Sequence, residues 1–218
     1  GSDNMNEFTI VAGAFGVGKS SFIGALTPLK NSLGKIISDN DMTAVRRIQS
    51  CMDDGVDFTL ESTLSGENTI AVIKTATEKG YRITLYYIAV NSAEESLRRI
   101  SNRVRKGGRD VSAEEVRRSY LHRFDTLPLI LPYCDSARFY DNENGFRYVA
   151  EYRNGEIIHD ENYCPDWLKE LNEKLVLAWD SDFTKVTEAE REQIKRAEES
   201  GFVRAEDIDW DNLEKYNG

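Results

Sequence analysis

The sequence predicts an α/β fold built on a mainly parallel sheet. Short runs rich in β-branched and aromatic residues alternate with stretches of helical periodicity along most of the chain. A glycine-rich loop follows the first of these runs directly and opens a helix. Because strand–helix alternation joins parallel strands through right-handed crossovers, we expect a three-layer structure with helices on both faces of the sheet.

The glycine-rich loop is the first candidate site. It follows an expected strand at residues 8–12 and reads G-A-F-G-V-G-K-S, the phosphate-binding pattern G-x-x-x-x-G-K-[ST]. Glycines let the backbone N–H groups approach a polyphosphate, Lys19 brings a positive charge to the outer phosphates, and the Ser20 hydroxyl can ligate Mg²⁺. We therefore expect ATP and Mg²⁺ to be bound by Gly13, Ala14, Phe15, Gly16, Val17, Gly18, Lys19, Ser20 and Ser21.

The second expected strand, at residues 34–38, ends in two aspartates. Asp39 and Asp41 precede an expected helix at residues 42–52. Ligands of open α/β sheets bind beyond the carboxyl ends of strands, but an aspartate there also caps a helix, and we expect one residue for each purpose. Asp41 is the candidate catalytic base, because it could accept or orient the proton of a substrate hydroxyl.

The third expected strand begins at residue 57 and runs into polar residues before a helix at residues 67–79. Glu61 and Thr63 lie at its end, where they offer an acceptor and a hydroxyl to a polar substrate. The longest β-rich run, at residues 81–90, predicts a central strand.

The middle of the chain carries the positive charge. Two expected helices, which start near Ser92 and Ser112, are separated by Gly107-Gly108, and nine arginines and lysines lie between residues 98 and 123. Mobile arginines on paired helices suit a lid that neutralises a transferring phosphoryl group. The candidates for this function are Arg103, Arg117 and Arg118.

Elements of a different kind follow. A strand is expected at residues 137–142, a β-hairpin at residues 146–159 with Asn154-Gly155 at its turn, and an amphipathic helix around Trp167. A charged helix at residues 187–200 and an acidic stretch around Trp210 come last. This C-terminal part is either a solvated helix and tail or an interaction arm.

Composition limits the class of protein. The chain has 218 residues and a formal net charge of −10, which disfavours nucleic acid as a partner. No apolar stretch is long enough to span a bilayer and no signal peptide precedes the first strand, so we expect a cytoplasmic protein without membrane association. Cys51, Cys134 and Cys164 show no metal-binding spacing and are expected to be reduced.

Several ordered motifs resemble the zeta-toxin family of P-loop kinases. Besides residues 13–20, Asp39-Asn40-Asp41 stands in place of that family's N-x-D, and residues 58–66 read F-T-L-E-S-T-L-S-G against its F-x-x-E-T-T-L-S-G. Residues 103–111 read R-V-R-K-G-G-R-D-V against R-x-x-x-G-G-H-x-V. The resemblance covers about residues 7–170 and implies a P-loop kinase fold with a helical lid.

The resemblance also implies an activity, which is transfer of the ATP γ-phosphate to a sugar hydroxyl of a UDP-amino sugar, typically UDP-N-acetylglucosamine. On this basis Asp41 matches the catalytic base, and Arg103 with one of Arg117 and Arg118 matches the phosphate-clamping arginines. Glu61 and Thr63 match substrate-site residues. Many members are toxins neutralised by a small helical antitoxin, which is the implied partner.

Two residues depart from the family pattern and are expected to affect the choice of sugar nucleotide. Asp39 stands where the family has Asn, and Arg109 where it usually has His. We therefore count both as candidate substrate-binding residues.

The expected organisation is an expression-tag remnant at residues 1–4, a zeta-toxin-like P-loop kinase domain at residues 5–175 and an acidic helical C-terminal extension at residues 176–218. Two alternatives stay open at this point. One is a P-loop kinase with another acceptor, such as a nucleoside, NAD or an antibiotic. The other is an ATP-binding regulatory module whose acidic arm forms a complex.

Overall fold

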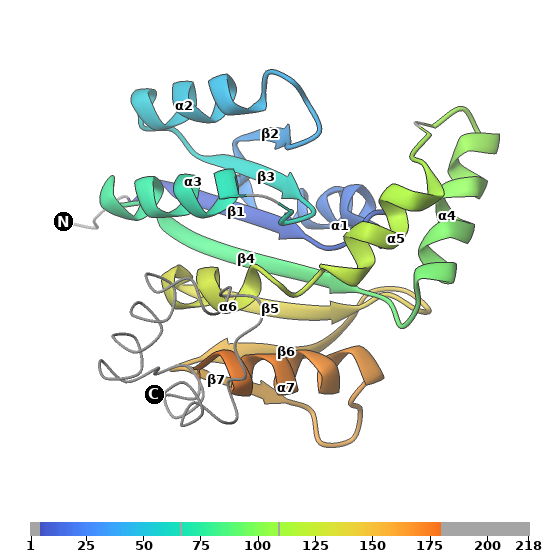
Figure 1. The fold of residues 1–218 in the computed structure, drawn as a ribbon. Coiled ribbons are helices and arrows are strands. Elements are labelled where there is room, and N and C mark those ends of the chain that lie inside the picture. The colour runs from blue at the N-terminus through green and yellow to red at the C-terminus, as the bar shows by residue number, and fades with distance from the viewer. Residues whose placement is uncertain (1–4, 66, 109, 180–218) are drawn as a thin grey trace, which may run out of the picture. The chain divides into compact units, whose positions relative to one another are not determined.

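A computed structural model describes residues 5–65, 67–108 and 110–179. Its centre is a seven-stranded sheet in the order β2-β3-β1-β4-β5-β6-β7 (Figure 1). The first five strands in that order are parallel, and β6 and β7 continue the sheet in antiparallel fashion. The strands are β1 (Glu7–Ala12), β2 (Lys35–Ser38), β3 (Phe58–Ser62), β4 (Arg82–Ala89), β5 (Ser136–Asp141), β6 (Arg147–Arg153) and β7 (Glu156–His159).

Helices cover both faces of this sheet, as the sequence predicts. Figure 1 shows α3 and α6 in front of it, α1 behind it, and α4 and α5 as a pair beyond the carboxyl ends of the strands. The described helices are α1 (Lys19–Leu26), α2 (Ala44–Asp54), α3 (Glu67–Glu78), α4 (Ala93–Arg105), α5 (Ala113–Leu121), α6 (Leu127–Ile130) and α7 (Asp166–Trp179), with 3₁₀ turns at Asn31–Leu33 and Leu131–Tyr133. The predicted α/β class with a mainly parallel sheet and paired lid helices is therefore confirmed.

Residues as far as Lys174 form one compact unit, which contains the sheet and everything described below as a site. The second unit starts at Leu175, and its described part is the end of α7. The expected tag remnant, the charged helix at residues 187–200 and the acidic stretch around Trp210 lie outside the described residues.

Local sequence signals set the two lid helices. The Ser92 hydroxyl accepts a hydrogen bond from the Glu95 N–H at 3.2 Å at the start of α4. At the start of α5, Ser112 and Glu115 form a reciprocal capping box. Gly107, with φ of 87°, lies in the break between the helices.

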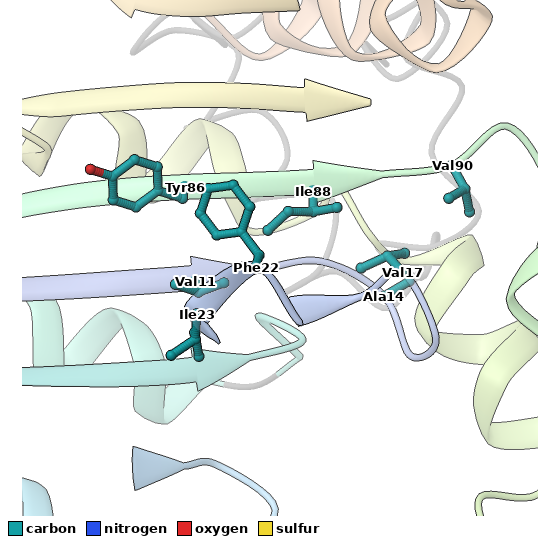
Figure 2. Close-up of a cluster of buried hydrophobic side chains, with 8 residues drawn as sticks. All are labelled: Val11, Ala14, Val17, Phe22, Ile23, Tyr86, Ile88 and Val90. Carbon is teal, nitrogen blue, oxygen red and sulfur yellow. The ribbon is translucent and has the colours of Figure 1, made fainter. Parts of the chain in front are cut away.

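A buried apolar cluster fixes the phosphate loop to the sheet (Figure 2). Ala14 and Val17 of the loop are each 1% exposed and lie in one cluster with Ile88 of β4 and Phe22 of α1. The other members are Val11, Ile23, Tyr86 and Val90. Because the loop's apolar side chains point into the core, its backbone is left to form the surface that faces a ligand.

A second anchor fixes the end of β5. The Asp141 carboxylate is 2% exposed and accepts hydrogen bonds from the Trp167 indole N–H at 2.7 Å and from the Tyr163 hydroxyl at 3.2 Å. Trp167 is among the largest fully buried side chains, so its N–H finds its partner here rather than in water. This contact holds the residues that follow β5 against the first turn of α7.

We predict that Asp141→Ala lowers the free energy of unfolding by roughly 1–3 kcal/mol, because it leaves the buried Trp167 N–H without an acceptor. Urea unfolding followed by tryptophan fluorescence measures this change. Asp160→Ala is the matched control, since Asp160 is exposed and its carboxylate accepts only from the Asn162 N–H among the described contacts. Equal effects of the two substitutions would show that the Asp141 anchor does not stabilise the fold.

Candidate active site

The phosphate loop opens into a cavity of ≈ 380 Å³ beyond the carboxyl ends of the strands. The loop and the start of α1 contribute Phe15, Gly16, Gly18, Lys19, Ser20 and Ser21. The opposite side is formed by Asn40, Glu61, Arg99, Ile100, Arg103, Val111 and Asn142. The structure thus brings the end of β3, the residue after β5 and helix α4 to the loop that the sequence identified.

Glycine is required where neighbouring atoms leave no room. Gly16 has φ of 78°, and a Cβ there would lie 2.6 Å from the Ser96 carbonyl oxygen of α4. Gly18 has φ of 102°, and a Cβ would lie 2.6 Å from Asn142 Nδ2. Both positions combine a left-handed backbone with direct contact, so only glycine allows this loop to form.

Lys19 is the central cation of the cavity. Its ammonium group donates to the carbonyl oxygens of Gly13 at 2.7 Å and Ala14 at 3.0 Å. Burial lowers the pKa of Lys19 to about 8, against the opposing attraction of the Glu61 and Asp39 carboxylates. Two carbonyl dipoles do not replace a counter-charge, so a bound anion would compensate this buried ammonium far better.

Ser20 and Glu61 provide oxygen ligands suited to Mg²⁺. The Ser20 hydroxyl donates to the Glu61 carboxylate, with distances of 3.1 and 3.3 Å to its two oxygens. A hydroxyl and one carboxylate beside bound phosphates fit Mg²⁺, which usually keeps several waters and few protein ligands. No group of three or more His, Cys, Asp or Glu residues in the described part of the chain forms a metal cluster of its own. Glu61, which was expected to contact the substrate, is therefore hydrogen-bonded to Ser20, the expected Mg²⁺ ligand.

The two aspartates after β2 lie in different environments, and the turn before α2 forms at Asp41, the expected catalytic base. The Asp41 carboxylate accepts from the Thr43 N–H at 2.8 Å and hydroxyl at 2.7 Å, and lies 3.4 Å from Arg47. The Thr43 hydrogen bonds, with help from Arg47, lower the pKa of Asp41. This turn also explains why α2 begins at Ala44 and not at residue 42.

The Asp39 carboxylate binds the end of β3 instead and, like Asp41, does not line the cavity. Its carboxylate accepts from the Ser62 hydroxyl at 2.6 Å and from the Thr63 N–H at 3.2 Å. Its charge also acts on the Lys19 ammonium. Asp41 does not line the cavity, whereas its neighbour Asn40 does.

The arginines expected in the lid separate into different environments. Arg103 lines the cavity and makes no ion pair within the described part of the chain. Arg117 is exposed and lines neither cavity described here, while Arg118 pairs with Glu114 at 2.8 Å. Arg109 lies outside the described residues.

A second cavity of ≈ 450 Å³ adjoins the first at Phe15, which lines both. Its other lining residues are Leu64, Ser65, Glu115, Arg118, Ser119, His122, Asp125 and Thr126. Leu64 adopts φ of 58°, which is rare for a bulky residue, and hydrogen bonds from Thr126 to its carbonyl and from its N–H to Ser62 hold it there. Thr63 lies next to this strained turn, and its hydroxyl is 2.7 Å from that of Ser65.

Arg99 and Asn142 are cavity residues that the sequence did not identify as such. Arg99 was one cation among many in the basic stretch, and Asn142 was only the end of an expected strand. Their places in the site come from contacts with the loop over 82 and 125 positions of sequence separation. No local pattern carries that information.

Part of the sequence matches the model of a known protein family. Residues 38–129 match the family model described as Zeta toxin. This part of the chain is thus similar to the zeta-toxin family. The match begins at the end of β2 and extends into α6, so it contains both aspartates, the end of β3 and the paired helices α4 and α5. The resemblance read from the motifs is confirmed for these residues, which do not include the phosphate loop.

One curated relative and two solved structures give the extent of the likeness. An uncharacterized protein of Haemophilus influenzae is 42% identical over 65 residues, which are 30% of this chain and 46% of that protein. The chain therefore spans less than half of the length of that relative.

The solved structures agree in fold at low identity. One, from a characterization of the PezAT chromosomal toxin–antitoxin system of Streptococcus pneumoniae, has a TM-score of 0.51 and 14% identity, and covers 91% of this chain and 87% of its own. The AvrRxo1-ORF1:-ORF2 structure with ATP has a TM-score of 0.54 and 17% identity, and covers 99% and 78%. At such low sequence identity, the structural similarity establishes only that the fold is shared. None of the described helices has the length and apolar character of a membrane-spanning segment.

We predict that ADP affinity falls as pH rises above 8. Bound phosphate raises the pKa of Lys19 from its value of about 8, so binding above that pH takes up a proton. The dissociation constant should be flat from pH 6.5 to 7.5 and then rise by up to about tenfold per pH unit. Isothermal titration calorimetry in buffers of different ionisation enthalpy measures both the dissociation constant and the number of protons taken up on binding.

Lys19→Met is the control for this pH dependence. It should weaken ADP binding at neutral pH and remove the rise above pH 8, because no titrating ammonium remains. A wild-type affinity that stays constant to pH 9.5 would contradict a Lys19 with lowered pKa at the phosphate site.

Proposed function

We propose that the protein is an ATP-dependent kinase of the zeta-toxin type, which phosphorylates a sugar hydroxyl of a UDP-amino sugar such as UDP-N-acetylglucosamine. The observation that carries the proposal is the buried Lys19 ammonium, which shares one cavity with the Ser20–Glu61 pair and with Arg103, which has no ion pair among the described residues. These groups supply the positive charge and the oxygen ligands that phosphoryl transfer requires. The zeta-toxin family match supports the same reaction class.

The residues have distinct tasks in the proposed reaction. Loop N–H groups and Lys19 bind the phosphates of ATP, and Ser20 with Glu61 would hold Mg²⁺. The metal ion would neutralise charge on the phosphates when bound. Arg103 reaches the cavity from α4 and stabilises charge on the transferring group.

Asp41 is the proposed residue that orients the acceptor hydroxyl. Its carboxylate is ionised at neutral pH, since its pKa is lowered, and among the described residues it is held only by Thr43 and by a long contact to Arg47 at the surface. A rotation about its side-chain bonds would exchange these partners for the acceptor. Asp39 already has two hydrogen-bond donors and acts on Lys19, so we assign it to support of the phosphate site.

The second cavity is the proposed place for the acceptor. It adjoins the first at Phe15 and carries hydroxyls together with the His122–Asp125 pair, whose atoms are 2.7 Å apart. Its volume and mixed lining suit a sugar or a nucleoside. Thr63 and Arg109 stay proposed substrate-binding residues, and Arg117 and Arg118 stay proposed lid arginines.

The proposed partner is a small antitoxin protein. The PezAT structure comes from a toxin–antitoxin system, and the AvrRxo1-ORF1 chain is paired with ORF2. A genome neighbour encoding such a protein, and co-purification of the two chains, would support this assignment.

We predict that the purified protein transfers the γ-phosphate of labelled ATP to UDP-N-acetylglucosamine in the presence of Mg²⁺. Phosphorus NMR of the product identifies the phosphorylated hydroxyl. A panel of other UDP-sugars, nucleosides, NAD and aminoglycosides separates this acceptor from the alternatives. If wild type and Asp41→Ala behave alike with every acceptor, the kinase assignment is wrong.

The two aspartates give opposite kinetic predictions. Asp41→Asn should reduce kcat by about 10²-fold or more while the KM for ATP changes little, because the acceptor loses its orienting carboxylate. Asp39→Asn should mainly raise the KM for ATP, because it weakens the loop's support and removes a charge near Lys19. The reverse pattern would transfer the orienting function to Asp39.

Glu61 gives a separate prediction for the metal. Glu61→Gln should raise the Mg²⁺ concentration for half-maximal ADP binding by roughly 10–100-fold, as substitutions around metal sites do. Thermal shift with ADP across a Mg²⁺ series measures it. Glu78→Gln, at the far end of α3, is the control, and an unchanged Mg²⁺ requirement for Glu61→Gln would leave Glu61 as a substrate residue.

A further inference from the structure

Two polar side chains hold the phosphate loop by a single carbonyl oxygen. The Val17 carbonyl accepts a hydrogen bond from Asn142 Nδ2 at 2.8 Å and a longer one from Arg99 Nη1 at 3.5 Å. Asn142 directly follows β5 and Arg99 lies in the lid helix α4. Three separate parts of the chain therefore meet at one peptide group.

Both side chains are themselves fixed. Arg99 donates to the carbonyl oxygens of Asn142 and Glu143, and its Nε lies 2.8 Å from the Glu95 carboxylate. The Asn142 N–H donates to the Ala89 carbonyl at 3.0 Å, which ties it to the end of β4. An arginine whose three nitrogens each bind a protein carbonyl or carboxylate is held in one orientation.

These contacts set the direction of the Val17–Gly18 peptide. In a trans peptide the N–H points away from the carbonyl oxygen, so anchoring the Val17 oxygen turns the Gly18 N–H the other way. The Gly18 N–H has no partner among the described residues, and Gly18 lines the cavity. The Val17 side chain, buried in the cluster of Figure 2, restrains the same peptide from its other side.

We propose that Asn142 and Arg99 are positioning residues for phosphate binding. They hold the Val17–Gly18 peptide with its N–H directed at the place of a nucleotide phosphate, so the loop is organised before the nucleotide arrives. This deepens the proposed kinase function and rests on it. Preorganisation of this kind increases affinity because the loop does not have to be ordered on binding.

The geometry also connects the lid to the loop. Arg99 belongs to the helix that carries Arg103, and the Ser96 carbonyl of that helix lies against Gly16. On the other lid helix, the Ser119 hydroxyl accepts from the Phe15 N–H at 3.1 Å. A displacement of α4 would therefore break the Arg99 contact to the Val17 carbonyl as well as withdraw Arg103.

The test compares neighbouring arginines and two ligands. Arg99→Lys keeps the charge but loses the planar fork that reaches several carbonyls. Arg98→Lys is its matched control, because within the described part of the chain the Arg98 side chain hydrogen-bonds only to Glu95. Asn142→Asp keeps the shape but replaces the donor by a carboxylate oxygen that repels the Val17 carbonyl. Affinities for Mg²⁺-ADP and for inorganic pyrophosphate are measured by calorimetry, and each free variant is melted to check its fold.

We expect ADP dissociation constants at least about tenfold higher for Asn142→Asp, about fivefold higher for Arg99→Lys and unchanged for Arg98→Lys, with melting temperatures close to wild type. Pyrophosphate affinity should fall by the same factors, because pyrophosphate contacts only the phosphate loop.

Wild-type affinity in both variants overturns the proposal, as does a loss of affinity that parallels a fall in the melting temperature. Loss of ADP affinity with unchanged pyrophosphate affinity overturns it in favour of direct contact with the nucleoside. A wild-type protein that binds neither ligand removes the kinase function together with the positioning role, whereas the other outcomes leave the kinase function standing.

Discussion

The site depends on one constraint, which is that the phosphate loop must bury its side chains and expose its backbone. Ala14 and Val17 enter the core, and the Lys19 ammonium folds back onto the carbonyl oxygens of Gly13 and Ala14. A buried ammonium with only two carbonyl partners is poorly compensated, as its lowered pKa indicates. The loop is therefore organised for an anion even though the protein as a whole carries a net charge of −10.

The elements around the loop follow from this constraint. The side chains of the loop are buried and cannot orient its exposed peptide groups. Polar side chains from other elements therefore fix the orientation of those peptides. The residue after β5 and the helices α4 and α5 supply them through Asn142, Arg99 and Ser119. The anchor of Asp141 on Trp167 acts one step further away, since it fixes the strand end that Asn142 continues.

The sequence predicts the parts of this structure that are encoded locally. The strand–helix alternation, the phosphate loop, the Ser92 and Ser112 caps and the hairpin turn at Asn154-Gly155 each lie within a few residues of chain, and the structure contains all of them. Asp41 does not line the cavity, because its carboxylate forms a side-chain turn with Thr43. The hydroxyl residue two positions after Asp41 signals that turn, and it was not used. Arg99 and Asn142 could not be found in this way, since their function lies in contacts between distant segments.

The two cavities differ in the charges that their side chains leave available for a ligand. In the first cavity neither Lys19 nor Arg103 forms an ion pair with a carboxylate of the described residues, so their positive charge is available to phosphate. In the second cavity the basic side chains already have acidic partners, Glu114 for Arg118 and Asp125 for His122. An acceptor there would be selected by shape and by hydrogen bonds to hydroxyl groups rather than by charge.

Phe15 lines both cavities, and its backbone N–H donates a hydrogen bond to the Ser119 hydroxyl of α5. The proposed phosphate-binding loop therefore also forms one wall of the proposed acceptor site, and we expect binding of the two substrates to be coupled through Phe15 and α5.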